Sequence, residues 1–158
     1  MGDLLRAMTY ADVPAVVTIQ EPGAVTALAT VFPQDEHPFP ADEIARRWRE
    51  EIDTAGIDCL VVLHGDVVVG FAATHGDELL HLGIAVEHWG TGLAAEAHDA
   101  LLDRMRCAGH SRAWLRVFTG NARGRRFYER LGWEPTGERT HSTFSPFPEL
   151  LRYERGLA

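Results

Sequence analysis

The segment that most constrains the fold is residues 82–94, which read Leu-Gly-Ile-Ala-Val-Glu-His-Trp-Gly-Thr-Gly-Leu-Ala. An apolar, strand-like run leads through two glycines into a helical pattern that continues to Ala108, and a second strand-like run follows at 112–118. A strand, a crossover helix and another strand predict a parallel pair joined by a right-handed connection. The free N–H groups and positive dipole of the helix start also predict a cradle for a phosphate.

The rest of the chain supplies further strand and helix patterns around this unit. We expect Glu21-Pro22-Gly23 to interrupt a helix that begins near Val13, and His64-Gly65-Asp66 to form a hairpin turn. The other expected strands are 4–9, 58–63, 67–74, 78–86, 133–139 and 150–155, and the other helices are 24–31, 41–54 and 121–130. The order predicts one α/β domain over residues 1–158, with a mixed, mostly antiparallel sheet of about six or seven strands flanked by about four helices.

Composition narrows the class of function. The formal net charge of −8 argues against a general nucleic-acid binder, and no apolar run is long enough for a membrane span. Cys59 and Cys107 lie in apolar neighbourhoods outside any CxxC pair, so we expect reduced core residues of a cytoplasmic protein. The histidines lack metal-ligand spacing, and no metal is expected.

A second motif follows one strand later, and the two motifs together are more informative than either one. It reads Asn121-Ala-Arg-Gly-Arg-Arg-Phe127-Tyr128-Glu-Arg-Leu131-Gly132-Trp133. Together the two segments resemble the GNAT superfamily of N-acetyltransferases, in which Arg/Gln-x-x-Gly-x-Gly/Ala opens a long helix and Asn-x-x-Ala-x-x-(aromatic or leucine)-Tyr-x-x-x-Gly-Phe follows. The match covers residues 78–137. A P-loop is excluded because no Gly-Lys-Ser/Thr follows, and a Rossmann fingerprint fits poorly.

The resemblance implies an enzyme that moves an acetyl group from acetyl-CoA to an amine, small molecule or peptide, by direct attack in a ternary complex. Many relatives are homodimers, so a homodimer is possible. The main chain at Ile84 and Val86 would pair with the pantetheine arm, and Asn121 would contact the cofactor. Tyr128 would lie at the thioester and act as general acid for the leaving thiolate. The pyrophosphate would be held by the backbone of Trp89, Gly90, Thr91, Gly92, Leu93 and Ala94.

Two departures from the family pattern bear on the site. Trp89 stands where arginine or glutamine is common, so a polar contact to the cofactor would be lost. Gly83 replaces a common aromatic residue, which we expect to widen the cleft near the acetyl group.

The proton acceptor has several candidates. Glu78 matches a position that some GNAT enzymes use as general base, directly or through water. His81 is the rival, but strand alternation places it on the opposite face unless a bulge intervenes. The proline-rich loop 32–40 is a candidate substrate wall. Antibiotics, amino acids, small amines and protein N-termini or lysines all remain open as acceptors. A non-catalytic acyl-CoA sensor, which would need neither acid nor base, is the alternative function.

Overall fold

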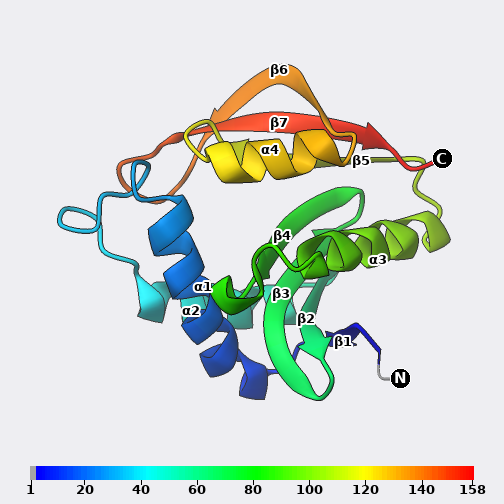
Figure 1. The fold of residues 1–158 in the computed structure, drawn as a ribbon, viewed down its shortest axis with the longest axis horizontal. Coiled ribbons are helices and arrows are strands. Elements are labelled where there is room, and N and C mark those ends of the chain that lie inside the picture. The colour runs from blue at the N-terminus through cyan, green and yellow to red at the C-terminus, as the bar shows by residue number, and fades with distance from the viewer. Residues whose placement is uncertain (1–2) are drawn as a thin grey trace.

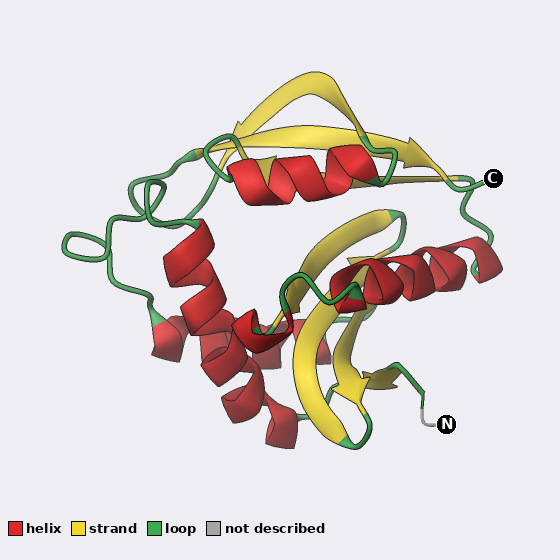
Figure 2. Ribbon diagram, in the orientation of Figure 1, coloured by secondary structure: helices red, strands yellow, loops and turns green. Residues whose placement is uncertain are grey.

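A computed structural model describes residues 3–158. They form one seven-stranded sheet with the strand order β1-β2-β3-β4-β5-β7-β6 and four α-helices (Figures 1 and 2). The strands are β1 (Leu5–Ala7), β2 (Ile57–His64), β3 (Val67–His75), β4 (Glu78–Ile84), β5 (Arg112–Phe118), β6 (Glu134–His141) and β7 (Glu149–Gly156). The helices are α1 (Val13–Ala27), α2 (Ala41–Asp53), α3 (Leu93–Cys107) and α4 (Ala122–Arg130), with short 3₁₀ turns at Tyr10–Asp12 and Val86–His88. The predicted fold class is confirmed.

The sheet is antiparallel except at its centre. β4 and β5, which α3 connects, are parallel, as the strand-helix-strand pattern predicts. Their pairing is confined to Glu78 and Trp114, after which the strands diverge on either side of the space between α3 and α4 (Figure 1). This divergence exposes one edge of β4 in the middle of the sheet.

Helices cover both faces of the sheet, and alternation along β2 separates the two cores. Val61 packs with Val16 of α1 and Trp48 of α2. Leu60, its neighbour in sequence, points the other way and packs with Leu101 of α3. Leu79 of β4 and Leu115 of β5 belong to the same core as Leu101, so packing positions both strands against α3.

Three local expectations are corrected by the structure. α1 runs unbroken past Pro22, because packing of Val13 and Val16 in the core outweighs the local penalty of a proline inside a helix. β4 ends at Ile84, two residues early, because the chain turns into a 3₁₀ turn. Cys107 is exposed, since it lies two residues beyond the buried Met105 and so faces away from the core, whereas Cys59 is buried; both are free thiols.

Within residues 3–158, no helix has the length and apolar character needed to cross a membrane.

Candidate active site

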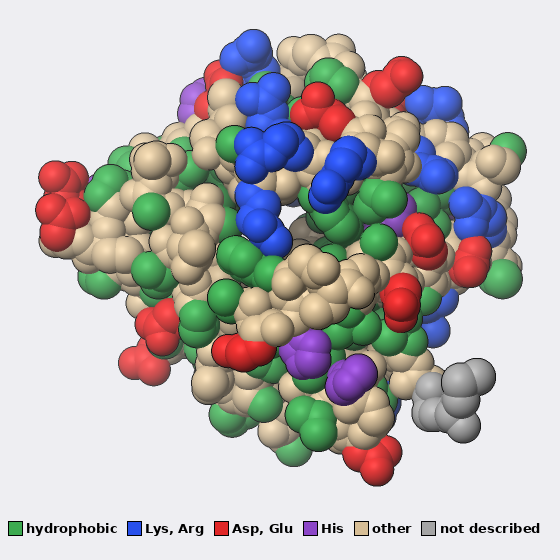
Figure 3. Space-filling model, viewed as in Figure 1, with side chains coloured by type: hydrophobic (Ala, Val, Ile, Leu, Met, Phe, Trp, Pro, Cys, Tyr) green, Lys and Arg blue, Asp and Glu red, His purple; other side chains and the backbone are tan. Residues whose placement is uncertain are grey.

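A cavity of about 1060 Å³ lies where β4 and β5 diverge, and we call it the β4–β5 cleft. Residues 79–84 of β4 and 115–118 of β5 line it, together with the start of α3, most of α4 and part of α1. Figure 3 shows a hollow near the middle of this face, with basic side chains gathered beside it. The cleft therefore joins an exposed strand edge to a helix N-terminus.

The start of α3 is a glycine turn that leaves several backbone amides free. Gly90 and Gly92 have φ angles of +78° and +89°, a region that favours glycine, and a Cβ at either position would meet nothing within 4 Å. Gly92 is the N-cap, and no side chain caps the helix. Among the described residues, the amides of Gly92, Ala94 and Ala95 have no hydrogen-bond acceptor. These free amides and the positive end of the helix dipole lie where the sequence predicts a phosphate cradle, and both favour an anion.

Arginines of α4 add positive charge to the cleft. Arg123, Arg126 and Arg130 line it, although the chain as a whole carries a net charge of −8. The guanidinium carbon of Arg123 lies 3.9 Å from the centre of the Trp89 ring, whose Nε1 donates a 2.9 Å hydrogen bond to the carbonyl of Ile84. Trp89 thus holds a cation beside the cradle. Sequence reasoning missed these arginines, and their concentration in one short helix was the available signal.

Most residues predicted to contact the cofactor meet in this cleft, and three do not. Those lining it are Ile84, Trp89, Gly90, Gly92, Ala94, Asn121 and Tyr128. Val86 lies in the 3₁₀ turn, where its carbonyl accepts a 3.1 Å hydrogen bond from the amide of Trp89. The hydroxyl of Thr91 donates to the carbonyl of His88 at 2.6 Å, and the side chain of Leu93 is buried in the core.

The space left by Gly83 is filled from the neighbouring strand. A Cβ at Gly83 would lie 2.2 Å from Cζ of Phe71, so the Phe71 ring occupies the volume that an aromatic side chain at 83 would need. The expectation that Gly83 widens the cleft is therefore wrong.

Asn121 has a structural task as well as a place in the cleft. Its side-chain oxygen accepts a 2.9 Å hydrogen bond from the amide of Gly124 and caps α4. A Cβ at 124 would lie 2.5 Å from the side-chain nitrogen of Asn121. The glycine that replaces the family's usual alanine therefore makes room for the cap.

Tyr128 is held by its ring rather than by its hydroxyl. The ring stacks edge-on against Phe127 and Trp133, at centroid distances of 5.1 and 5.9 Å. No group in residues 3–158 forms a hydrogen bond with its hydroxyl. Burial raises the pKa of the Tyr128 hydroxyl well above its usual range, so it stays protonated at neutral pH.

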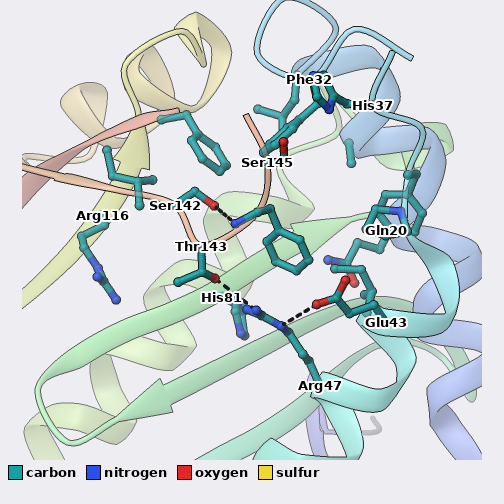
Figure 4. Close-up of a pocket in the computed structure, with 18 of the residues that line it drawn as sticks. Gln20, Phe32, His37, Glu43, Arg47, His81, Arg116, Ser142, Thr143 and Ser145 are labelled. Atoms are coloured by element: carbon teal, nitrogen blue, oxygen red, sulfur yellow. Dashed lines mark hydrogen bonds and ion pairs between the residues drawn. The ribbon is translucent and has the colours of Figure 1, made fainter. Parts of the chain in front are cut away.

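A second cavity, of about 750 Å³, adjoins the cleft, and we call it the α2 chamber. The proline-rich loop and α2 form one side, and β4, β5 and the segment after β6 form the rest (Figure 4). Phe32, Phe39, Trp48, Phe118 and Phe144 give it aromatic walls. It also holds four carboxylates, of Glu36, Glu43, Glu51 and Glu78, against two arginines, Arg47 and Arg116. The loop 32–40 is thus a cavity wall, as its composition suggested.

A β-bulge brings both candidate bases into this chamber. Thr74 pairs with Leu79 and Ala73 pairs with His81, which leaves Leu80 without a partner on β3. The extra residue reverses the alternation, so that Glu78 and His81 line the same chamber. The simple alternation that separated them does not hold at this point.

The two candidates have different partners. Glu78 is 7% exposed, and its carboxylate lies 3.3 Å from the guanidinium of Arg116. Nε2 of His81 lies 2.9 and 3.1 Å from the two carboxylate oxygens of Glu51. Across the described part of the chain, no group of three or more His, Cys, Asp or Glu side chains is arranged to hold a metal ion.

Comparison with known proteins identifies the family of this chain and other proteins with the same fold. The model of the acetyltransferase (GNAT) family matches residues 23–133, and no curated protein matches the chain in sequence. Spermidine N-acetyltransferase from Vibrio cholerae, solved with CoA and spermine, has a TM-score of 0.71 and 18% identity, covering 97% of this chain and 94% of that one. An N-acetyltransferase from Thermoplasma acidophilum, solved with coenzyme A, has a TM-score of 0.74 and 14% identity, covering 99% of both chains.

A ribosomal-protein-alanine N-acetyltransferase from Brucella melitensis is similar to the same degree, with a TM-score of 0.70, 20% identity, and coverage of 98% of this chain and 99% of that one. At these identities the solved structures show a shared fold. The family model, by contrast, spans both motifs and the strands and helices that form the cleft. The chain belongs to the GNAT family of acetyltransferases.

Proposed function

We propose that residues 1–158 form one N-acetyltransferase domain that takes acetyl-CoA in the β4–β5 cleft and a small cationic amine in the α2 chamber. As a GNAT protein, the chain is an enzyme that moves an acetyl group from acetyl-CoA to an amine. The observation that carries the finer proposal is that the two cavities meet. His81, Leu80, Arg116 and Phe118 line both, so a thioester and an amine can reach each other there.

The cleft suits acetyl-CoA in shape and charge. The unpaired amides at the start of α3 would bind the diphosphate, with Arg123 beside them to balance its charge. The exposed edge of β4 at Ile84 would pair with the pantetheine arm, as an added strand does. Because Val86 sits in a 3₁₀ turn, we assign that pairing to the strand before it.

The α2 chamber suits a compact amine rather than a folded protein surface. Its volume of about 750 Å³ is in the range of small-molecule sites. Its carboxylates outnumber its arginines, and aromatic rings offer faces to a cation. Phe144 already holds a cation in this way, since the guanidinium carbon of Arg47 lies 4.1 Å from its ring centre. The Vibrio cholerae relative, solved with spermine, is in keeping with a cationic acceptor.

The chemistry requires the acceptor to lose protons. An alkylammonium ion is protonated at neutral pH and cannot attack a carbonyl. Glu78, which is buried and lines the chamber, would bind this ammonium and take a proton from it, directly or through water. A backbone amide of β4 near 82–84 would polarise the thioester carbonyl. Tyr128, protonated and without a hydrogen-bond partner in the described chain, would protonate the departing thiolate.

The test is thiol release from acetyl-CoA with a panel of amines: spermidine, an arylalkylamine, free amino acids and an alanine-starting peptide. The proposal expects turnover with small cationic amines and little with the peptide. The chain contains no lysine, so the enzyme has no lysine side chains to acetylate and confuse the assay. Binding of acetyl-CoA without thiol release for any amine would identify the sensor instead.

The cellular location and the oligomeric state are predictions that can each be measured directly. We expect a cytoplasmic protein, which cell fractionation would test. A homodimer is possible, and light scattering after size exclusion would distinguish it from a monomer of 17.5 kDa.

A further inference from the structure

We propose that His81, oriented by Glu51 of α2, is a second proton acceptor of the reaction and takes the proton that leaves the nitrogen after it has attacked the thioester. This inference rests on the proposed acetyl transfer. It adds a catalytic residue, His81, and a positioning residue, Glu51, to the roles of Glu78 and Tyr128.

The position of His81 carries the first part of the argument. Glu78 lines the α2 chamber but not the cleft, whereas His81 lines both cavities. The bulge at Leu80 is what turns His81 into this junction. The proton that the nitrogen loses after it has attacked must be taken by a group that lies where the amine meets the thioester. Of the two candidates, His81 occupies that place.

The partners of His81 decide which nitrogen is free. Nε2 faces both carboxylate oxygens of Glu51, at 2.9 and 3.1 Å, and so donates its hydrogen to them. Nδ1 then carries the lone pair, and it has no hydrogen-bond partner among the residues that the structure describes. Packing holds the His81–Glu51 pair in place. The ring centre of Trp48 lies 5.0 Å from that of His81, and Nε1 of Trp48 donates a 2.9 Å hydrogen bond to Gln20.

Other charges around His81 are mostly paired already. Arg47 lies 3.7 Å from Glu43, and Arg116 lies 3.3 Å from Glu78. Dashed lines in Figure 4 join Arg47 to Glu43 and to Thr143. The remaining titratable groups of the chamber are those of Glu36 and His37 in its outer loop and His141 at the end of β6. Glu51 is therefore the charge bonded directly to His81.

The proton balance gives each group a task. An ammonium nitrogen carries three protons and the amide product one, so two protons leave it. Glu78 takes the first, which frees the lone pair that forms the C–N bond. Nδ1 of His81 takes the second from the nitrogen that has become positively charged. The C–S bond breaks, and the thiolate takes the proton of Tyr128. Glu78 and His81 return their protons to water, Tyr128 regains one, and one proton is released overall.

The test compares the pH dependence of kcat in His81→Asn, Glu51→Gln and the wild type, with an amine that the wild type acetylates. We expect His81→Asn to lower kcat by about 10²-fold or more and to remove an acid limb from the profile, while the Kd of acetyl-CoA is unchanged. Glu51→Gln should lower kcat less than His81→Asn and leave the KM of acetyl-CoA unchanged, because the imidazole stays in place but loses the carboxylate that fixes Nδ1 as its free nitrogen. Glu51→Asp, which keeps a carboxylate on α2, should restore part of the lost kcat.

Glu50→Gln is the matched control, because it removes the same charge from the neighbouring, exposed position, where the carboxylate pairs with Arg46 instead. Its profile should be that of the wild type. The inference is overturned if folded His81→Asn keeps the wild-type kcat and acid limb, or if Glu50→Gln lowers kcat as much as Glu51→Gln. If the wild type itself releases no thiol with any amine, the proposed function fails, and this inference with it.

Discussion

Replacing Tyr128 with phenylalanine should separate catalysis from stability. The hydroxyl has no hydrogen-bond partner within residues 3–158, and the ring contacts with Phe127 and Trp133 would survive. The free energy of unfolding should therefore change by less than about 1 kcal/mol. A general acid contributes about 10²- to 10⁴-fold, so turnover should fall by that factor, equivalent to roughly 2.7 to 5.5 kcal/mol in the barrier.

The assay follows thiol release under saturating acetyl-CoA and amine, with Kd for acetyl-CoA from calorimetry and the free energy of unfolding from urea titration. Burial raises the pKa of Tyr128 above its ordinary value of 10.0, so the wild type should show no loss of kcat from this group between neutral pH and that value. The acid would stay protonated throughout that range.

Tyr153 provides the matched control. It is fully buried, and its hydroxyl donates to Glu129 and accepts from Arg125, each at 3.1 Å. Tyr153→Phe should destabilise the fold by about 1 to 2 kcal/mol and leave kcat nearly unchanged, the opposite pattern. Wild-type turnover in Tyr128→Phe would remove Tyr128 from the mechanism and refute the reasoning.

Three further changes have defined outcomes. Gly92→Ala, at a φ of +89°, should weaken acetyl-CoA binding in calorimetry and destabilise the fold by about 1 kcal/mol; unchanged affinity would argue against the cradle. Asn121→Ala removes the α4 cap and should cost about 1 kcal/mol in urea unfolding. Burial lowers the pKa of His98, and Nε2 of the neutral ring accepts a hydrogen bond from Trp133. The contribution of neutral His98 to the free energy of unfolding is therefore present above pH 6.5 and is lost as the pH falls through the pKa of His98 in the folded state. His98→Gln should flatten that acid dependence of Tm, and an unchanged slope would contradict it.

Much of the fold follows from local patterns in the sequence. The run from β4 through α3 to β5 was predictable because a glycine turn between an apolar strand and an amphipathic helix allows few alternatives. The continuation of α1 past Pro22 was not predictable from the local sequence, because packing of the helix against the sheet outweighs the tendency of a proline to break a helix.

The site was predictable in outline and less so in detail. The two motifs placed Tyr128 and the glycine cradle at one cleft. The bulge at Leu80 leaves no mark in the hydrophobic pattern, yet it decides that His81 shares a chamber with Glu78. Its partner, Glu51, lies on a helix thirty positions earlier and meets His81 only through the packing of α2 on the sheet.

The most direct measurement is a calorimetric titration of the folded protein with acetyl-CoA, repeated with Arg123→Ala. Unpaired amides at the start of α3, with the arginine stacked on Trp89, should bind one acetyl-CoA per chain, and the variant should bind more weakly at low salt. Absence of binding to wild-type protein with a cooperative unfolding transition would contradict the account.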